Sequence, residues 1–223
     1  MQFLTSLSPN RVERQRYCLD SWKVFGKIIA VQREDEIPSL QSLFSDVEFR
    51  TAAPSSSFSK PTPKITEIVK YADEPSLLIN SDISIKDSNL DLWNYEEGIL
   101  KLGIRTDYFP NSSSRKFRQK YGIDAFLIYP EMRDLLPDLD FCIGCPGWDF
   151  WLPYHLWFKH NYEIRTPDCI FLHELHPLGW TDQDQKSYRA RIAASEYKLT
   201  YSMLPAFILD ITNRTHLKAV SWR

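Results

Sequence analysis

The chain has 223 residues, of which 43% are hydrophobic and 25% charged, a composition typical of a globular protein with a substantial core. Its formal net charge of −2 offers little attraction for phosphate backbones, so we expect no nucleic-acid partner. With seven glycines and neither G-x-G-x-x-G nor a P-loop sequence, the common glycine-rich phosphate loops are excluded.

The apolar segments of the chain are too short to cross a bilayer, and the amino terminus lacks the apolar core of a signal peptide. We therefore expect no transmembrane segment and a cytoplasmic location. The four cysteines do not indicate a disulfide scaffold in a chain of this size. Cys142 and Cys145 form a C-x2-C pair, which with Cys169 and His173 formally permits a structural zinc site, but buried free thiols are the simpler interpretation.

The first half of the chain alternates strand-like and helix-like segments. Residues 2–7 form a short β-like run, and Asn10 with Glu13 has the spacing of a capping box. The helix that follows carries apolar residues on one face, namely Cys18, Trp22 and Phe25, and ends at Gly26. Further segments continue the alternation: a strand at 27–32, a helix at 37–44, a strand at 47–52, a Pro- and Ser-rich loop at 51–64, a helix from Thr62 and a strand at 76–83.

The second half is less regular. Its expected elements are a strand at 99–109, a polar loop at 111–122, a strand at 123–129, a turn and helix within 141–164, a strand ending in two histidines within 169–180, a helix at 186–201 and a strand at 206–211. Repeated β-α-β units with short connections predict an α/β fold whose first strands are parallel.

The polar trio Asn80-Ser81-Asp82 interrupts an apolar, strand-like segment. A carboxylate buried without a partner is strongly unfavourable, so the trio either faces solvent or holds a cation. Because three strand-helix units precede it, we place it at the carboxyl end of a strand, where open α/β sheets bind ligands. Mg²⁺ or Mn²⁺ would accept such oxygen ligands, and an ordinary Asx turn is the alternative.

A second candidate is the stretch Gly147-Trp148-Asp149-Phe150-Trp151. Asp149 falls in the first turn of the expected helix, where the helix dipole favours an ionised carboxylate. We therefore expect a charged Asp149 that accepts a proton, with Trp148 and Trp151 as stacking surfaces for an acceptor. The alternative is a carboxylate that only stabilises its helix.

The third candidate is the pair His173 and His176, which are three positions apart. On an extended strand this spacing points the two rings to opposite faces, so we expect one to reach the ligand edge. Either ring could complete a metal site with Asp82 on a neighbouring strand.

These segments, in their order along the chain, resemble the small single-domain nucleotide-sugar glycosyltransferases of the GT-A fold. The resemblance rests on FLTSLSP, IIAVQREDE, LLINSDI, GIDAF, FCIGCPGWDFWLP and the late histidine pair, and covers most of the chain up to about Trp180. It implies a single α/β domain over residues 1–223 with an open, mixed, Rossmann-type sheet and helices on both faces. Residues 1–85 would be the nucleotide-binding half, and residues 86–223 the acceptor-binding half with a C-terminal tail.

The resemblance also implies roles for individual residues. In that family a strand-end D-x-D motif binds the metal and the donor diphosphate, and here Asn80 replaces the first Asp, which leaves Asp82 as the principal ligand of Mn²⁺ or Mg²⁺. Asp149 takes the place of the catalytic base, and Asp124 joins it as a catalytic residue that positions the acceptor or supports the site. Both histidines qualify as the downstream ligand, with His176 slightly preferred. The implied donor-binding residues are Thr5, Ser6, Gln32, Glu34, Lys60, Lys64, Asn80, Ser81 and Arg105.

The implied activity is metal-dependent, inverting transfer of a sugar from a nucleotide diphosphate donor, a UDP-sugar by preference, to a hydroxyl of a glycan or other acceptor. Two alternatives remain open. A sugar-phosphate nucleotidyltransferase shares much of the fold, but the loop after the first strand has no glycine. A nucleotide-sugar or carbohydrate-binding module without catalysis is favoured by Asn80.

Overall fold

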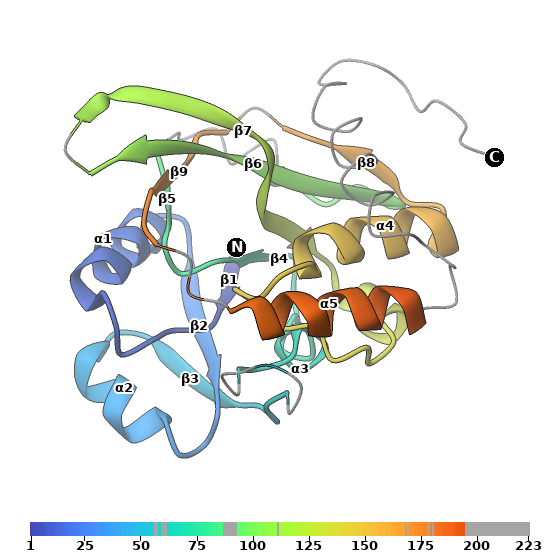
Figure 1. Ribbon diagram of the computed structural model, residues 1–223, viewed down its shortest axis with the longest axis horizontal. Helices are drawn as coiled ribbons and strands as arrows, with labels where there is room; N and C mark the ends of the chain where they lie inside the picture. Colours follow the sequence, from blue (N-terminus) through green and yellow to red (C-terminus); the bar gives the residue numbers. More distant parts are fainter. Residues whose placement is uncertain are drawn as a thin grey trace.

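The computed structural model describes residues 1–55, 58, 62–86, 93–110, 112–167, 169–177, 179 and 181–194 (Figure 1). Its strands are β1 (Gln2–Thr5), β2 (Lys27–Gln32), β3 (Glu48–Thr51), β4 (Ser76–Ile79), β5 (Ile83–Ile85), β6 (Ile99–Phe109), β7 (Ser112–Ile128), β8 (Glu163–Arg165) and β9 (Phe171–Glu174). Its helices are α1 (Val12–Lys23), α2 (Ile37–Leu43), α3 (Ile65–Val69), α4 (Trp148–His160) and α5 (Asp182–Ala194), with a 3₁₀ helix at Pro130–Leu135.

The strands of this part of the chain form one sheet in the order β3-β2-β1-β4-β7-β6-β9-β5, with β8 paired to β6. β1, β2, β3 and β4 run parallel, as the alternation of strands and helices predicts. β7 is antiparallel to both β4 and β6, and β5 is antiparallel to β9. The predicted α/β class with an open, mixed sheet is therefore confirmed.

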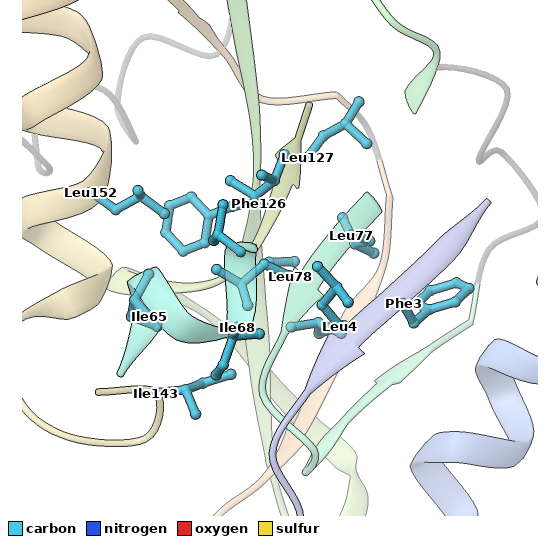
Figure 2. Close-up of a cluster of buried hydrophobic side chains, with 14 of the residues drawn as sticks. Phe3, Leu4, Ile65, Ile68, Leu77, Leu78, Phe126, Leu127, Ile143 and Leu152 are labelled. Carbon is cyan, nitrogen blue, oxygen red and sulfur yellow. The ribbon is translucent and has the colours of Figure 1, made fainter. Parts of the chain in front are cut away.

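Helices cover both faces of the sheet, because successive residues of a strand point to opposite sides. Phe3 of β1 stacks on Trp22 of α1, with ring centroids 5.6 Å apart. Its neighbour Leu4 points the other way, into a cluster with Leu78 and with Ile68 of α3 (Figure 2). All five of these core side chains, on β1, β4 and the two helices, are fully buried.

The carboxyl ends of the parallel strands share one edge of the sheet. Thr5 at the end of β1 is in register with Ala30, and Gln32 at the end of β2 is in register with Thr51. β4 ends beside them at Ile79, so the trio 80–82 emerges at this edge. The predicted placement of the trio is confirmed.

The predicted capping box of α1 is wrong. The N-cap is Arg11, in a left-handed conformation with φ 55°, and it makes no side-chain cap hydrogen bond. The buried side chain of Gln15 instead forms hydrogen bonds with the loop before α1. Its Nε2 donates to the backbone carbonyls of Ser8 (2.8 Å) and Asn10 (2.6 Å). A glutamine inside the helix therefore holds the preceding loop, and no side chain caps the start of α1.

The predicted polar loop at 111–122 is also wrong. The segment belongs to β7, which pairs antiparallel with β6 along a hairpin whose arms extend beyond the parallel half of the sheet (Figure 1). Backbone pairing explains the outcome, because the hydrogen bonds between β6 and β7 are made by main-chain groups, which polar residues also supply. The predicted helix at 186–201 is observed as α5, and its end and the predicted strand at 206–211 lie outside the described residues.

Candidate functional site

Asp82 lies in the turn that separates β4 from β5. The four residues of β4 are fully buried, whereas Asn80, Ser81 and Asp82 are partly exposed. The Ile83 amide donates to the Asn80 carbonyl at 3.2 Å and closes the turn. The local sequence thus ends a buried strand and presents a carboxylate at the sheet edge.

His173 and His176 both reach this carboxylate. The Asp82 Oδ2 atom is 2.9 Å from His176 Nε2 and 3.5 Å from His173 Nε2, and the two Nε2 atoms are 3.2 Å apart. The expectation that the rings point to opposite faces is wrong, because β9 ends at Glu174 and His176 lies beyond the strand. His173, in contrast, stays in register with Ile83 of β5.

In each ring, a hydrogen bond at Nδ1 orients the ring so that its Nε2 faces Asp82. His176 Nδ1 lies 2.8 Å from the Pro177 carbonyl, which can only accept, so Nδ1 carries the proton. His173 Nδ1 lies 3.0 Å from Oδ1 of Asp107, a fully buried carboxylate. Both Nε2 atoms point to the same place as Asp82, so each could offer a lone pair to a metal ion there once it carries no proton, with its Nδ1 held by a hydrogen bond.

The spacing of the three atoms fits a metal coordination shell. Ligands about 2.1 Å from an ion and about 90° apart are separated by about 3 Å, close to the three observed distances. Among the described residues, Asp82, His173 and His176 are the one group of three His, Cys, Asp or Glu side chains that could hold an ion. Two imidazoles and one carboxylate suit Mn²⁺ and other transition metals better than Mg²⁺, which prefers oxygen ligands.

The carboxylates around these side chains favour a positive charge between them. Burial would raise the pKa of Asp82, but its contacts with His173 and His176 hold it well below its usual range. Burial would lower the pKa of His173, but the hydrogen bonds to Asp107 and Asp82 raise it to about 9. Either a proton on His173 or a metal ion at the same position therefore balances the two carboxylates.

A chain of charged groups leads from His173 into the sheet. Arg105 of β6 pairs with Asp107 (Nε to Oδ1, 3.0 Å) and with the buried Asp124 of β7 (Nη1 to Oδ2, 2.8 Å). The Asn80 side-chain amide donates to the other oxygen of Asp124. This contact gives a reason for Asn at position 80, because an aspartate there would face a second carboxylate.

Asp149 lies at the far end of this network, in the first turn of α4. Burial raises its pKa to about 8, the negative charge of Asp124 adds to that effect, and Arg105 and the amides of Asp149 and Phe150 oppose it. The expectation of an ionised Asp149 at neutral pH is therefore wrong, since desolvation outweighs the helix dipole. Its carboxyl group is mainly protonated at pH 7.

The start of α4 is fixed by Gly147, whose φ of 93° suits glycine. A Cβ atom there would overlap the ring of Tyr188 on α5. The expectation that Trp148 and Trp151 are stacking surfaces is wrong, because their exposed fractions are 2% and 1%. Trp148 packs on Phe126 and Trp151 on Phe141, so both rings anchor α4 to the core.

Most of the other predicted donor-binding residues line the carboxyl edge of the first strands. Gln32 fixes the loop after β1, because its amide contacts Ser6 Oγ (3.0 Å) and donates to the Leu7 carbonyl (2.8 Å). Thr5 is buried at the end of β1, and Ser81 lies in the turn beside Asp82. Glu34 lines a hollow of about 820 Å³ between the ends of β2 and β3 and α3.

Of the two predicted lysines, the structure describes Lys64. Lys64 forms ion pairs with Asp138 (2.7 Å) and Asp140 (3.8 Å). Lys60 lies outside the described residues. Their proposed contact with a diphosphate stays a prediction.

Sequence reasoning missed two residues that the structure brings to the site. Asp107 shares a face of β6 with Arg105, and this charged pair at i and i+2 within an apolar strand was the available signal. Arg14 of α1 donates to the carbonyls of Asp82 (3.3 Å) and Leu172 (3.4 Å), and its guanidinium lies between aromatic rings of Tyr17 and Tyr108. No local motif marked Arg14.

The zinc site formally allowed by the cysteines does not form. His173 is committed to Asp82 and Asp107, and the described cysteines belong to no group of three metal-ligating side chains. All four cysteines are free thiols.

Comparison with known proteins adds little beyond the fold. No family model and no curated protein matches the chain. Among solved structures, a Bacillus anthracis protein assigned as a glucose-1-phosphate thymidylyltransferase and crystallised with sucrose is similar over 85% of this chain and 93% of its own, with 10% identity and a TM-score of 0.44. In the described part of the chain, no helix has both the length and the apolar character that a membrane crossing requires.

Proposed function

We propose that this protein is a metal-dependent transferase that acts on a nucleotide sugar or a sugar phosphate. The observation that carries the proposal is the convergence of Asp82, His173 and His176 at the carboxyl edge of the parallel strands. Ligands of open α/β sheets bind at that edge, and a metal there is placed to meet their phosphates.

The specific reaction we propose is transfer of a glycosyl group from a nucleotide diphosphate donor to a hydroxyl, with inversion. A bound divalent ion would neutralise the negative charge that grows on the leaving diphosphate. The ends of β1, β2 and β4, all within residues 1–85, would hold the donor, and groups from residues 86–223 would meet the acceptor. A UDP-sugar is the first donor to test.

Asp149 would take the proton from the acceptor hydroxyl. A carboxylate whose pKa is about 8 is a stronger base than an ordinary aspartate, although only its ionised fraction is active. Asp124 and Arg105 set that pKa in opposite directions, because one contributes a negative and the other a positive charge next to Asp149. Their ion pair at 2.8 Å also fixes where each charge lies.

A nucleotidyltransferase that joins a nucleoside triphosphate to a sugar phosphate is the second candidate. Arg14 favours it, because its guanidinium touches the Asp82 backbone and brings positive charge beside the proposed metal. Arg11 lies nearby, 3.6 Å from Glu174 at the end of β9. A triphosphate carries more negative charge than a diphosphate sugar and gains more from such neighbours.

One experiment separates these activities. The purified protein is incubated with Mn²⁺ and a panel of nucleotide sugars, with and without acceptors, and in parallel with nucleoside triphosphates and sugar 1-phosphates. Release of nucleoside diphosphate supports glycosyl transfer, whereas release of pyrophosphate supports nucleotidyl transfer. Binding without turnover for every pair would contradict both and identify a binding module.

Two variants and a matched control connect the activity to the site. Asp82→Asn and Asp149→Asn should each abolish transfer while the protein stays folded. Asp73→Asn changes an exposed carboxylate that pairs with Arg133, and should leave the rate unchanged. Full activity of either site variant would reject the role assigned to that residue.

A further inference from the structure

Cys142 and Cys145 form a C-x2-C pair that the proposed transfer reaction does not use. The Cys145 amide donates to the Cys142 carbonyl at 3.3 Å, so the four residues close a tight turn. The first and fourth Cα atoms of a turn lie within about 7 Å, and disulfides need about 4.4–6.8 Å. The turn therefore already brings the two Cα atoms close to that range.

The two sulfur atoms lie side by side. Cys142 Sγ is 3.5 Å from the Thr62 carbonyl oxygen, and Cys145 Sγ is 3.6 Å from Oγ1 of the same threonine. The Cys145 thiol also donates a hydrogen bond to the Cys142 sulfur, which lowers the pKa of Cys142 against the opposing effect of burial. Cys142 is thus the better thiolate of the pair.

The segment around the pair is held in place by the rest of the fold. Lys64 forms a β-bridge with Cys142, and the Ile65 amide donates to the Phe141 carbonyl at 2.7 Å. Cys142 is fully buried, but Cys145 is partly exposed and within reach of a reagent in solution. A reagent in solution would therefore react first with the sulfur of Cys145.

We propose that Cys142 and Cys145 are a redox-active dithiol that a small disulfide, such as oxidised glutathione, converts reversibly to an intramolecular disulfide. Cys142 first loses its proton to solvent, and its thiolate then takes the proton of Cys145 as Cys145 Sγ attacks one glutathione sulfur. The other glutathione sulfur leaves as a thiolate and is protonated by solvent. Cys142 then loses its proton and attacks Cys145 Sγ, which breaks the mixed disulfide and releases the second glutathione. The protein loses two electrons and two protons, and one glutathione disulfide becomes two thiols. This site is independent of the proposed transferase activity.

The experiment uses the folded Cys169→Ser protein, in which one partly exposed thiol has been removed. It is incubated with oxidised glutathione, quenched in acid, alkylated, digested and analysed by mass spectrometry at successive times. We expect the peptide with both cysteines to lose two hydrogen atoms at least tenfold faster than Cys18 is modified. Cys18 is the internal control, because it is fully buried and burial raises the pKa of its thiol to about 12.

A matched variant and a stability measurement complete the test. Additional replacement of Cys145 by Ser should leave Cys142 as a free thiol, because no partner sulfur is in reach. Oxidation of the unsubstituted pair should raise the midpoint of thermal unfolding, and dithiothreitol should restore the original value. Oxidation no faster than that of Cys18, or a lower midpoint after oxidation, would overturn the proposal.

Discussion

The rate of transfer should depend on pH through Asp149, because a base is active only when ionised. With a pKa of about 8, the ionised fraction is about one half at pH 8, about one tenth at pH 7 and about one hundredth at pH 6. kcat/KM should therefore be about fivefold lower at pH 7, and about 50-fold lower at pH 6, than at pH 8.

The charges next to Asp149 make this prediction specific. Asp124 raises the pKa of Asp149 by repulsion, so Asp124→Asn should move the inflection of the profile to lower pH. Asp138→Asn changes a carboxylate of the Lys64 ion pair and serves as the control, with an unchanged inflection.

The assay is an initial-rate measurement between pH 5.5 and 9.5 at saturating Mn²⁺, with the donor held well below its KM. A profile that is flat above pH 6, or that falls as the pH rises from 6 to 8, would refute the assignment of Asp149, with its raised pKa, as the base. Circular dichroism at each pH shows whether the fold is retained.

Three further outcomes are expected. Asp107→Asn should weaken Mn²⁺ binding about 10- to 100-fold by calorimetry with the fold intact, because the buried carboxylate orients His173; unchanged affinity would contradict this. EDTA should abolish transfer, and Mn²⁺ or Co²⁺ should restore it at lower concentration than Mg²⁺, since two ligands are imidazoles; equal potency of Mg²⁺ would argue against the histidines as ligands. Trp148→Ala should lower the free energy of unfolding by about 3–5 kcal/mol in urea titrations, because the ring is buried on Phe126; an unchanged stability with a raised acceptor KM would restore Trp148 as an acceptor surface.

Much of the fold could be predicted from the sequence because several strands of the sheet, such as β1, β2 and β4, are mainly apolar runs. The strands at 27–32 and 99–109 are observed with the predicted bounds, and β4 ends where its first polar residue begins. The strand at 112–122 could not be predicted from the sequence, because backbone pairing with β6 rather than an apolar pattern forms it.

The three side chains of the candidate metal site were predicted as residues but not in their geometry, and Asp107 and Arg14 were missed. The convergence of His173 and His176 depends on where β9 ends, and the protonation of Asp149 depends on how deeply the fold buries the start of α4. Both are tertiary properties that no local spacing encodes. The burial of Trp148 and Trp151 is also a tertiary property, because the sequence of an aromatic cluster does not show whether its rings pack into the core or face solvent.

Anomalous diffraction at the manganese edge, from crystals soaked with Mn²⁺ and a nucleotide sugar, tests the central claim most directly. We predict one strong peak within about 2.3 Å of Asp82 Oδ2 and of Nε2 of both His173 and His176, with donor phosphate oxygens completing the shell. A nucleotide bound at this edge with no manganese among the three side chains would contradict the account.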